Sequence, residues 1–164
     1  MKPPGRSILV VAIVALLGLM GGIVYYASLD NDDLSSATIE MGEVELVDVN
    51  SIENRATLKV SFLVKNNGDV TVTVPVITFD LFADGSSIGN GTYSTEDVAM
   101  PGRAAFYPDA EIPLTTRMTI TMSEMNEGVY NKIVSGQPIQ YSATGMMTVE
   151  SAWSIVELDF DTNS

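Results

Sequence analysis

Three methionines are the side chains in this sequence whose type and spacing come closest to a ligand set. Met118, Met122 and Met125 follow one another at intervals of four and three residues. Thioether sulfur binds Cu(I), and a site built from methionine needs no cysteine. Methionine is also a common filler of hydrophobic cores, which is the simpler interpretation of these residues. We therefore predict no metal centre and no cofactor, and name the three methionines as the candidate ligands.

The residues that most often carry catalysis are missing from the sequence. The chain contains no histidine and no cysteine, which removes the commonest general base and the commonest metal ligand. Its carboxylates are numerous, but they fall into no recognisable pair of acid and base. The acidic run Asp30–Asp33 lacks the glycine and the glutamate of a calcium-binding loop, whose twelfth position would be Met41. We therefore expect no catalytic residues and no enzyme activity.

An uncharged stretch near the N-terminus, Ser7–Ala27, predicts one transmembrane helix. Eleven of its residues are Ile, Leu or Val. As a helix it spans about 31 Å, close to the thickness of the hydrocarbon core of a bilayer. A helix is required there because lipid offers no partner to backbone N–H and C=O groups. Tyr25 and Tyr26 fall where an interfacial aromatic belt belongs.

The basic residues around this stretch predict its orientation. Lys2 and Arg6 precede it, and no basic residue follows until Arg55. The preference of basic flanks for the cytoplasm therefore places residues 1–6 inside as a short stub and the rest of the chain outside the cytoplasm. The alternative is a cleavable signal peptide, which has a shorter apolar run and small residues at its end, whereas bulky tyrosines precede Ala27.

Two glycines on the predicted anchor raise the question of pairing. Gly18 and Gly22 stand four residues apart, the spacing at which two membrane helices can approach closely. A homodimer through the anchor helix is one interpretation, and the ordinary glycine content of membrane helices is the other.

Acidic residues dominate the part of the chain that follows the anchor. All 21 acidic residues lie beyond Ala27 with six of the eight basic residues, which leaves this part with a formal charge of −15. Such a charge argues against nucleic acid as a partner and against docking on an anionic lipid surface. It suits solubility in high salt, cation binding or a basic partner.

Beyond the anchor, the pattern changes from a polar link to β-strands. Residues 28–37 are polar and acidic and predict a flexible tether. Residues 38–160 show a hydrophobic period of two, the alternation of half-buried strands. Residues 161–164 form a short polar tail. The clearest alternation places four apolar residues on one face: Leu58, Val60, Phe62 and Val64.

Local signals divide this region into seven or so strands. Asn66–Asp69 and Asp84–Gly85 predict turns, because these residue types accept positive φ. The apolar parity switches at Pro75, where we predict a bulge or a strand break. One helix is expected, with Ser123 as its cap and Gly136 at its end. The fold class is all-β: an immunoglobulin-like seven-stranded β-sandwich with one short helix, preceded by the transmembrane helix.

One sequence signal concerns modification. Asn90-Gly91-Thr92 is the only N-glycosylation sequon in the chain. In a domain outside the cytoplasm, Asn90 could carry a glycan. The alternative interpretation of the same residues is a bulge or turn marked by glycine.

Between about Glu43 and Leu158, short motifs follow one another in a recognisable order. An aliphatic strand leads into Asn66 and Asn67, and Ile-Gly-Asn-Gly, Ile-Pro-Leu and Tyr-Ser-Ala-Thr-Gly segments follow. Their characteristic residues are Asn66, Asn67, Gly89, Gly91, Pro113 and Gly145. This ordered set resembles the late-embryogenesis-abundant type 2 domain, also called the water stress and hypersensitive response (WHy) domain. The family pattern has proline where this chain has Asn67, so a role tied to that proline does not carry over.

The resemblance implies a seven-stranded sandwich with a small helix and a stress-protective or envelope-associated role without enzyme activity. With its anchor and its acidic, cysteine-free composition, the chain looks like a membrane-anchored prokaryotic form of the domain, and this composition favours an archaeal origin. We therefore expect a membrane-anchored, extracytoplasmic module with a non-catalytic binding, structural or stress-protective role. Its expected partners are the membrane and an unknown protein or envelope component.

Two alternative functions stay open. One is a pilin-like filament subunit or an archaellum-type accessory subunit, because such proteins also join an apolar N-terminal helix to a β-sandwich. A processed pilin needs a cleavage site, and Gly5 precedes the apolar run without the acidic residue expected within that run. The other alternative is a small accessory subunit of a larger membrane complex.

Overall fold

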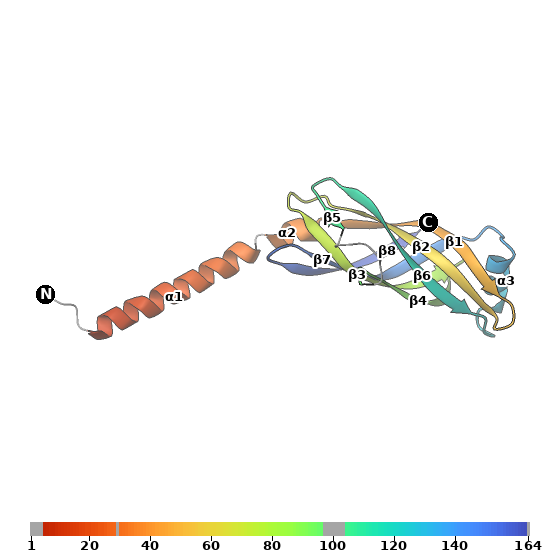
Figure 1. Cartoon of the computed structure of the whole chain (residues 1–164), viewed down its shortest axis with the longest axis horizontal. Coiled ribbons are helices and arrows are strands. Elements are labelled where there is room, and N and C mark those ends of the chain that lie inside the picture. The colour runs from red at the N-terminus through yellow and green to blue at the C-terminus, as the bar shows by residue number, and fades with distance from the viewer. Residues whose placement is uncertain (1–4, 29, 97–103, 164) are drawn as a thin grey trace.

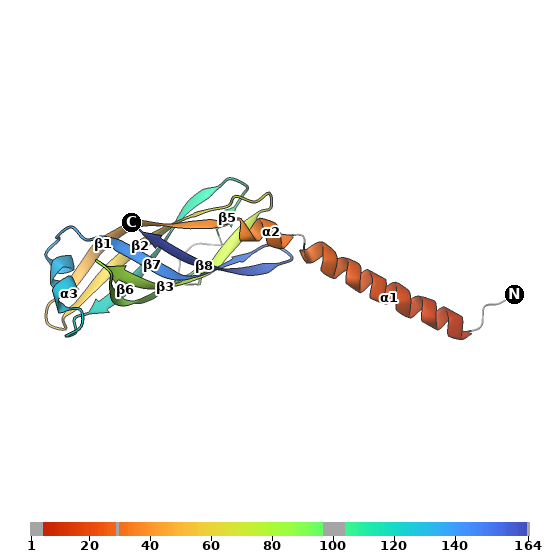
Figure 2. The ribbon, with the colours of Figure 1, turned by 180° about the vertical axis from the view of Figure 1, so that it is seen from behind.

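A single long helix and a β-rich body make up the computed structural model, which describes residues 5–28, 30–96 and 104–163. The helix, α1 (Gly5–Ser28), projects from one end of the body (Figure 1). Figure 2 shows the same arrangement from behind. Among the described residues, α1 belongs to the one helical stretch long and apolar enough to cross a membrane.

Two antiparallel sheets form the body. One has the strand order β1-β2-β6, and the other has the order β4-β3-β7-β8, with β5 paired to β3. Constant immunoglobulin domains place four strands against three in a different order, and eight strands, not seven, lie in the described part of this chain. The strands are β1 (Thr38–Asn50), β2 (Arg55–Lys65), β3 (Val72–Ala83), β4 (Ser86–Ser94), β5 (Ala105–Phe106), β6 (Glu111–Thr121), β7 (Tyr141–Glu150) and β8 (Ile155–Asn163).

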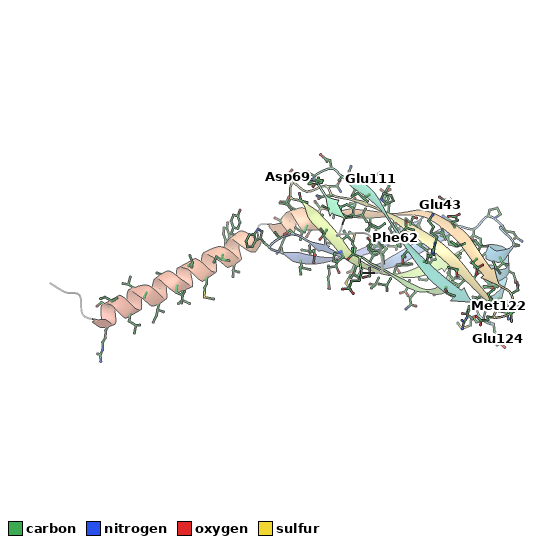
Figure 3. All side chains as sticks on the ribbon, in the orientation of Figure 1. Glu43, Phe62, Asp69, Glu111, Met122 and Glu124 are labelled. Atoms are coloured by element: carbon green, nitrogen blue, oxygen red, sulfur yellow. The ribbon has the colours of Figure 1, made fainter. Side chains whose placement is uncertain are left out.

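The hydrophobic core lies between the two sheets. Residues of β2 alternate between buried and half-buried, as the sequence pattern predicts. Phe62 of β2 lies at the centre (Figure 3). Its ring centroid is 4.9 Å from that of Phe79 on β3 and 5.8 Å from that of Phe160 on β8, and both pairs meet edge to face. Such pairs add about 0.5–1.5 kcal/mol each beyond their burial, so the three rings help to join the sheets.

Threonine hydroxyls connect the sheets along both sides of the body. The backbone N–H of Met41 on β1 donates to Thr162 Oγ1 on β8 at 2.9 Å. On the other side, Thr116 Oγ1 of β6 donates to the backbone oxygen of Thr92 on β4 at 2.8 Å. Thr162 is buried and β8 continues to Asn163. The expected tail from residue 161 is therefore part of the sheet, because its threonine completes a hydrogen bond of β1.

The irregularity expected at Pro75 is confirmed. The pairing of β3 with β7 shifts register between Thr73 and Val76. The buried residues of β3 change parity across this shift, from Val72 and Val74 to Ile77. Proline lacks the N–H that a regular ladder requires, so the bulge lets both halves of β3 face the core.

The helix expected from Ser123 is shorter than predicted. It spans α3 (Glu127–Val134) and buries Tyr130 and Ile133. Ser123 does not cap it, because the preceding turn is organised by Asn126. The Oδ1 of Asn126 accepts the backbone N–H of Ser123 at 2.7 Å. Gly136 follows the helix with φ of 68°, as a C-terminal glycine commonly does.

Candidate functional site

Asn66 is the buried polar centre of the loop that follows β2. Its side chain is fully buried, and its Nδ2 donates to the backbone oxygens of Val70 at 2.8 Å and Phe106 at 3.0 Å. Its Oδ1 accepts the backbone N–H of Gly68 at 3.0 Å. An unpaired buried amide would destabilise the fold by about 1–3 kcal/mol, whereas a fully paired one specifies a single arrangement. Asn66 therefore fixes the loop after β2.

The neighbouring Asn67 holds the segment that leads in from α1. Its Nδ2 donates to the backbone oxygen of Ser36 at 3.0 Å and to Thr38 Oγ1 at 3.1 Å. Gly68 lies so close to this segment that an added Cβ would be 2.7 Å from the backbone oxygen of Asp33. Proline, the residue of the family pattern, has no side-chain donor. The departure at Asn67 therefore supplies two contacts that the family residue would not make.

The segment expected to be a flexible tether contains a short helix, α2 (Asp30–Ser35), packed on the sandwich. Leu34 of α2 is fully buried in the core. Asn31 Oδ1 accepts a hydrogen bond from Ser154 Oγ in the β7–β8 loop. Burial of one leucine side chain contributes about 1.5–3 kcal/mol, which offsets part of the entropy lost when the segment becomes ordered. The predicted flexible tether is therefore wrong for this segment, because its one leucine packs into the core.

The β7–β8 loop lies beside α2 at the end of the body from which α1 projects (Figures 1 and 2). Ser151 Oγ accepts the backbone N–H groups of Trp153 and Ser154, each at 3.2 Å. The backbone N–H of Ser151 donates to the oxygen of Ser154 at 2.8 Å. These bonds hold the loop in one shape and leave Trp153 70% exposed. Trp153 shares a recess with five residues of α1: Gly18, Leu19, Gly22, Ile23 and Tyr26.

The anchor residues predicted from the sequence all lie within α1: Ser7, Gly18, Gly22, Tyr25, Tyr26 and Ala27. The helix starts at Gly5 and ends at Ser28, close to the predicted limits. Gly18 and Gly22 have open space where a Cβ would be added. Residues 1–4 of the predicted stub lie outside the described residues.

The three candidate copper ligands lie in different surroundings. Met118 on β6 is buried in the core, and Met122 is partly buried against it. Met125 is 97% exposed, in the region that Figure 3 marks with Met122 and Glu124, far from α1. Their distribution favours core packing for Met118 and Met122. In the part of the chain that the structure describes, no three His, Cys, Asp or Glu residues gather as a metal site.

Asn90, the glycosylation candidate, is exposed on β4 of the five-stranded sheet. It lies opposite Asp80 of β3. A shallow recess of about 390 Å³ surrounds it, lined by Thr78, Phe79, Asp80, Asn90, Gly91, Thr92, Gly145, Met146 and Asp159. Asn90 pairs regularly with β3. The register shift between β3 and β4 falls between Leu81 and Phe82 of β3. Glycosylation of Asn90 stays a prediction.

Two glycines of the family motif make room for Phe79. Gly91 and Gly145 lie on either side of Phe79 in the ladder of the five-stranded sheet. A Cβ on Gly91 would lie 2.4 Å from the Phe79 ring, and a Cβ on Gly145 would lie 2.0 Å from the backbone oxygen of Thr78. These motif residues therefore serve packing. Gly89 has a φ of 140°, which side chains rarely adopt.

Two further sequence features are Pro113 on β6 and a Gly-x-Ser-x-Gly segment in the β3–β4 hairpin. Pro113 lies on β6, an edge strand, opposite Leu63, and edge strands are where a sheet tolerates proline. Gly85-Ser86-Ser87-Ile88-Gly89 has the Gly-x-Ser-x-Gly spacing of hydrolases. That motif acts on a turn from a strand into a helix with a histidine partner. Here the segment lies in the β3–β4 hairpin, and the chain has no histidine.

Comparison with known proteins adds a likeness in fold. No protein-family model and no curated protein matches the sequence. A solution structure from Arabidopsis thaliana matches over 77% of this chain and 79% of its own, with 14% identity and a TM-score of 0.51. An X-ray structure of the structural genomics target SoR45 matches over 80% and 86%, with 9% identity and a TM-score of 0.50.

A solution structure described as a late embryogenesis abundant protein also matches. The match covers 96% of this chain and 88% of the other, with 10% identity and a TM-score of 0.45. At these identities, the comparisons concern the arrangement of the two sheets and not an activity.

Proposed function

We propose that the chain is a single-pass membrane protein that holds a non-catalytic β-sandwich on the outer side of the cell membrane. In this proposal it is an archaeal-type, membrane-anchored form of the late-embryogenesis-abundant type 2 domain. Its role is that of a binding, structural or stress-protective module of the envelope. The ordered sequence motifs support the family part of the proposal. The fold likeness to the Arabidopsis thaliana structure supports only the two-sheet fold.

The observation that carries the proposal is the junction between the apolar helix and the sandwich. Leu34 of α2 is buried in the core, and Asn67 binds the same segment through Ser36 and Thr38. A domain that only had to be retained at a membrane could hang on a flexible linker. A folded junction suits a domain that must keep its position and orientation relative to the bilayer.

The charge distribution supports the outer location. Lys2 and Arg6 flank the start of α1, and the part beyond Ala27 has a formal charge of −15. Basic flanks favour the cytoplasmic side. A strongly acidic surface keeps a protein soluble and disfavours contact with nucleic acid. The absence of histidine and cysteine from the sequence supports a role without acid–base or thiol catalysis.

Single-cysteine labelling in intact cells tests the location. The chain has no cysteine, so Met125→Cys places one thiol at the exposed far end of the body, and Lys2→Cys places one before α1. A membrane-impermeant maleimide is expected to label Met125→Cys in intact cells and Lys2→Cys only after lysis. Labelling of Met125→Cys only after lysis would overturn the proposal.

The protective role has its own readout. A strain that lacks the gene is expected to survive drying or osmotic upshift less well than the parent strain. The intact chain should restore survival, and a version that lacks residues 5–28 should not, because it would not be held at the membrane. Equal survival of the deletion strain would contradict the protective role and leave the location unaffected.

A further inference from the structure

We propose that the β7–β8 loop, Ser151–Ser154, is a second membrane contact that places the Trp153 side chain in the lipid interface beside the end of α1. This inference rests on the proposed anchoring of α1 in a membrane. It adds a lipid-binding surface to the sandwich itself. The occupant is the boundary between headgroups and acyl chains of zwitterionic lipid.

The loop has the composition of an interfacial contact. Residues 151–156 carry no charge, and Trp153 and Ile155 are 70% and 66% exposed. Trp153 on the loop and Ile155 at the first position of β8 form an apolar surface that water solvates poorly. Tryptophan is enriched at membrane interfaces, because its ring is apolar and its N–H needs a polar partner.

The position of the loop agrees with this chemistry. Trp153 lines one recess with Gly22, Ile23 and other residues of α1. It lines a second recess with Tyr26, Val70, Thr71, Ser151 and Ala152. The loop therefore lies beside about the last three turns of α1, from Gly18 onward. If those turns lie in the outer half of the bilayer, Trp153 is level with Tyr26 at its surface.

The loop is also held in the shape that presents Trp153. The side chain of Ser151 accepts two backbone N–H groups of the loop, and Ser154 bonds to Asn31 of α2. An anchor held in its bound shape loses little entropy when it enters the interface. The neighbouring carboxylates Asp32 and Asp33 of α2 oppose an anionic lipid surface, which is why the proposal names zwitterionic lipid.

The fluorescence of Trp153 tests the proposal without a mutation, because Trp153 is the only tryptophan in the chain. The full-length protein is reconstituted into phosphatidylcholine vesicles with and without bromine on the acyl chains. We expect emission shifted to the blue, quenching by the brominated lipid and protection from iodide in the water. Emission typical of a water-exposed indole, quenched by iodide and insensitive to bromine, would overturn the proposal.

A moved tryptophan is the matched control. In a chain with Trp153→Phe and Met125→Trp, the single tryptophan lies at the far end of the body. It is expected to be quenched by iodide and to lose the response to brominated lipid. Equal bromine quenching at both positions would contradict a contact specific to the β7–β8 loop.

Two further outcomes separate this inference from its premise. Failure of the protein to float with the vesicles would contradict the anchoring by α1. Flotation with Trp153 protected from both iodide and bromine would mean that protein covers the residue, as in a second copy packed along Gly18 and Gly22. That result would overturn the lipid contact and leave the anchoring unaffected.

Discussion

Gly145 shows how the absence of one side chain supports the packing of a neighbouring strand. It lies next to Phe79 in the central ladder, and the Phe79 ring meets Phe62 of the opposite sheet. The ladder continues from Gly145 to Phe160, which also packs on Phe62. The glycine lets the two strands approach closely beside the aromatic cluster.

Gly145→Ala is expected to lower the free energy of unfolding by about 3 kcal/mol, the upper end of the usual range for overpacking. The added Cβ would lie 2.0 Å from the backbone oxygen of Thr78, which is not free to move aside. Chemical denaturation of the full chain in detergent measures the change. Gly128→Ala is the control, because nothing lies within 4 Å of its Cβ position in α3. It should be neutral or stabilising by up to about 1 kcal/mol, and equal losses in both variants would contradict the packing argument.

The stability of the β3–β4 turn is expected to depend on pH through Asp84. Its carboxylate accepts bonds from Lys132 Nζ at 2.8 Å and from the backbone N–H of Gln140 at 3.2 Å. These bonds, that from Lys132 first, lower the pKa of Asp84 in the folded protein. The contribution to stability is therefore present above the ordinary pKa of aspartate and is lost as the pH falls through the lowered value.

Asp84→Asn tests this dependence, because asparagine also accepts the φ of 49° at this position. The variant should have a slightly lower Tm than the wild type at neutral pH, and the difference should disappear in acid. Lys132→Gln should show the same pH profile. A difference in Tm that does not change with pH would contradict a role for the Asp84 charge.

At the scale of elements, α2 is the part that sequence patterns missed. Its six residues are mostly polar, so neither period nor composition indicates a helix. The available signal was Leu34, a single apolar residue whose burial depends on strands far away in the sequence. By contrast, β2 and the irregularity at Pro75 followed from parity alone, because one face of each strand meets the core.

The loop after β2 was predicted for an incomplete reason. Asn66–Asp69 does connect β2 to β3. Its residues do not adopt positive φ, however, because the positive φ values among the described residues lie elsewhere: Asn54, Asp84, Gly85, Gly89, Asp109 and Gly136. The amide of Asn66 shapes the loop through three backbone contacts. Composition predicted the turn, but the hydrogen bonds of the buried Asn66 amide, which shape it, are visible only in the structure.

Asn67→Asp is expected to loosen α2 from the sandwich. The change keeps the size of the side chain and removes the donor to Ser36 and Thr38, at about 0.5–1.5 kcal/mol per hydrogen bond. Hydrogen exchange followed by mass spectrometry should show faster exchange in residues 30–37, with little change in β2 or β3. Asn90→Asp, a matched change at an exposed site on β4, should leave this segment unchanged. Unaltered exchange in Asn67→Asp would mean that Leu34 alone holds α2.

At the scale of the whole molecule, the two ends of the body differ in what they present. The end near α1 combines the buried amide of Asn66, α2 and the exposed Trp153. The far end combines α3 with the turn between β1 and β2, and Figure 3 marks it by Met122 and Glu124. The sequence predicted the strands of this body but not this polarity, because polarity depends on which loops the topology brings together.

The contact between Met41 and Thr162 illustrates the same limit, since 121 residues separate its partners. Each residue lies on a strand whose alternation is visible in the sequence, yet no local pattern pairs them. The prediction of a short tail at residues 161–164 was wrong for residues 161–163, which belong to β8, for this reason. Long-range pairs between the two sheets are therefore the part of the fold that required the structure.

The two hydrogen bonds that Thr162 and Thr116 make between the sheets affect how copies of the chain could pack side by side. In the proposed anchored state, the chain would meet its own copies by lateral diffusion at a high local density, and exposed edge strands are templates for aggregation between chains. Thr162 occupies a donor on the border of β1, and Thr116 occupies an acceptor on the border of β4. Fewer backbone groups on the sheet edges are therefore available to pair with a strand of a neighbouring copy.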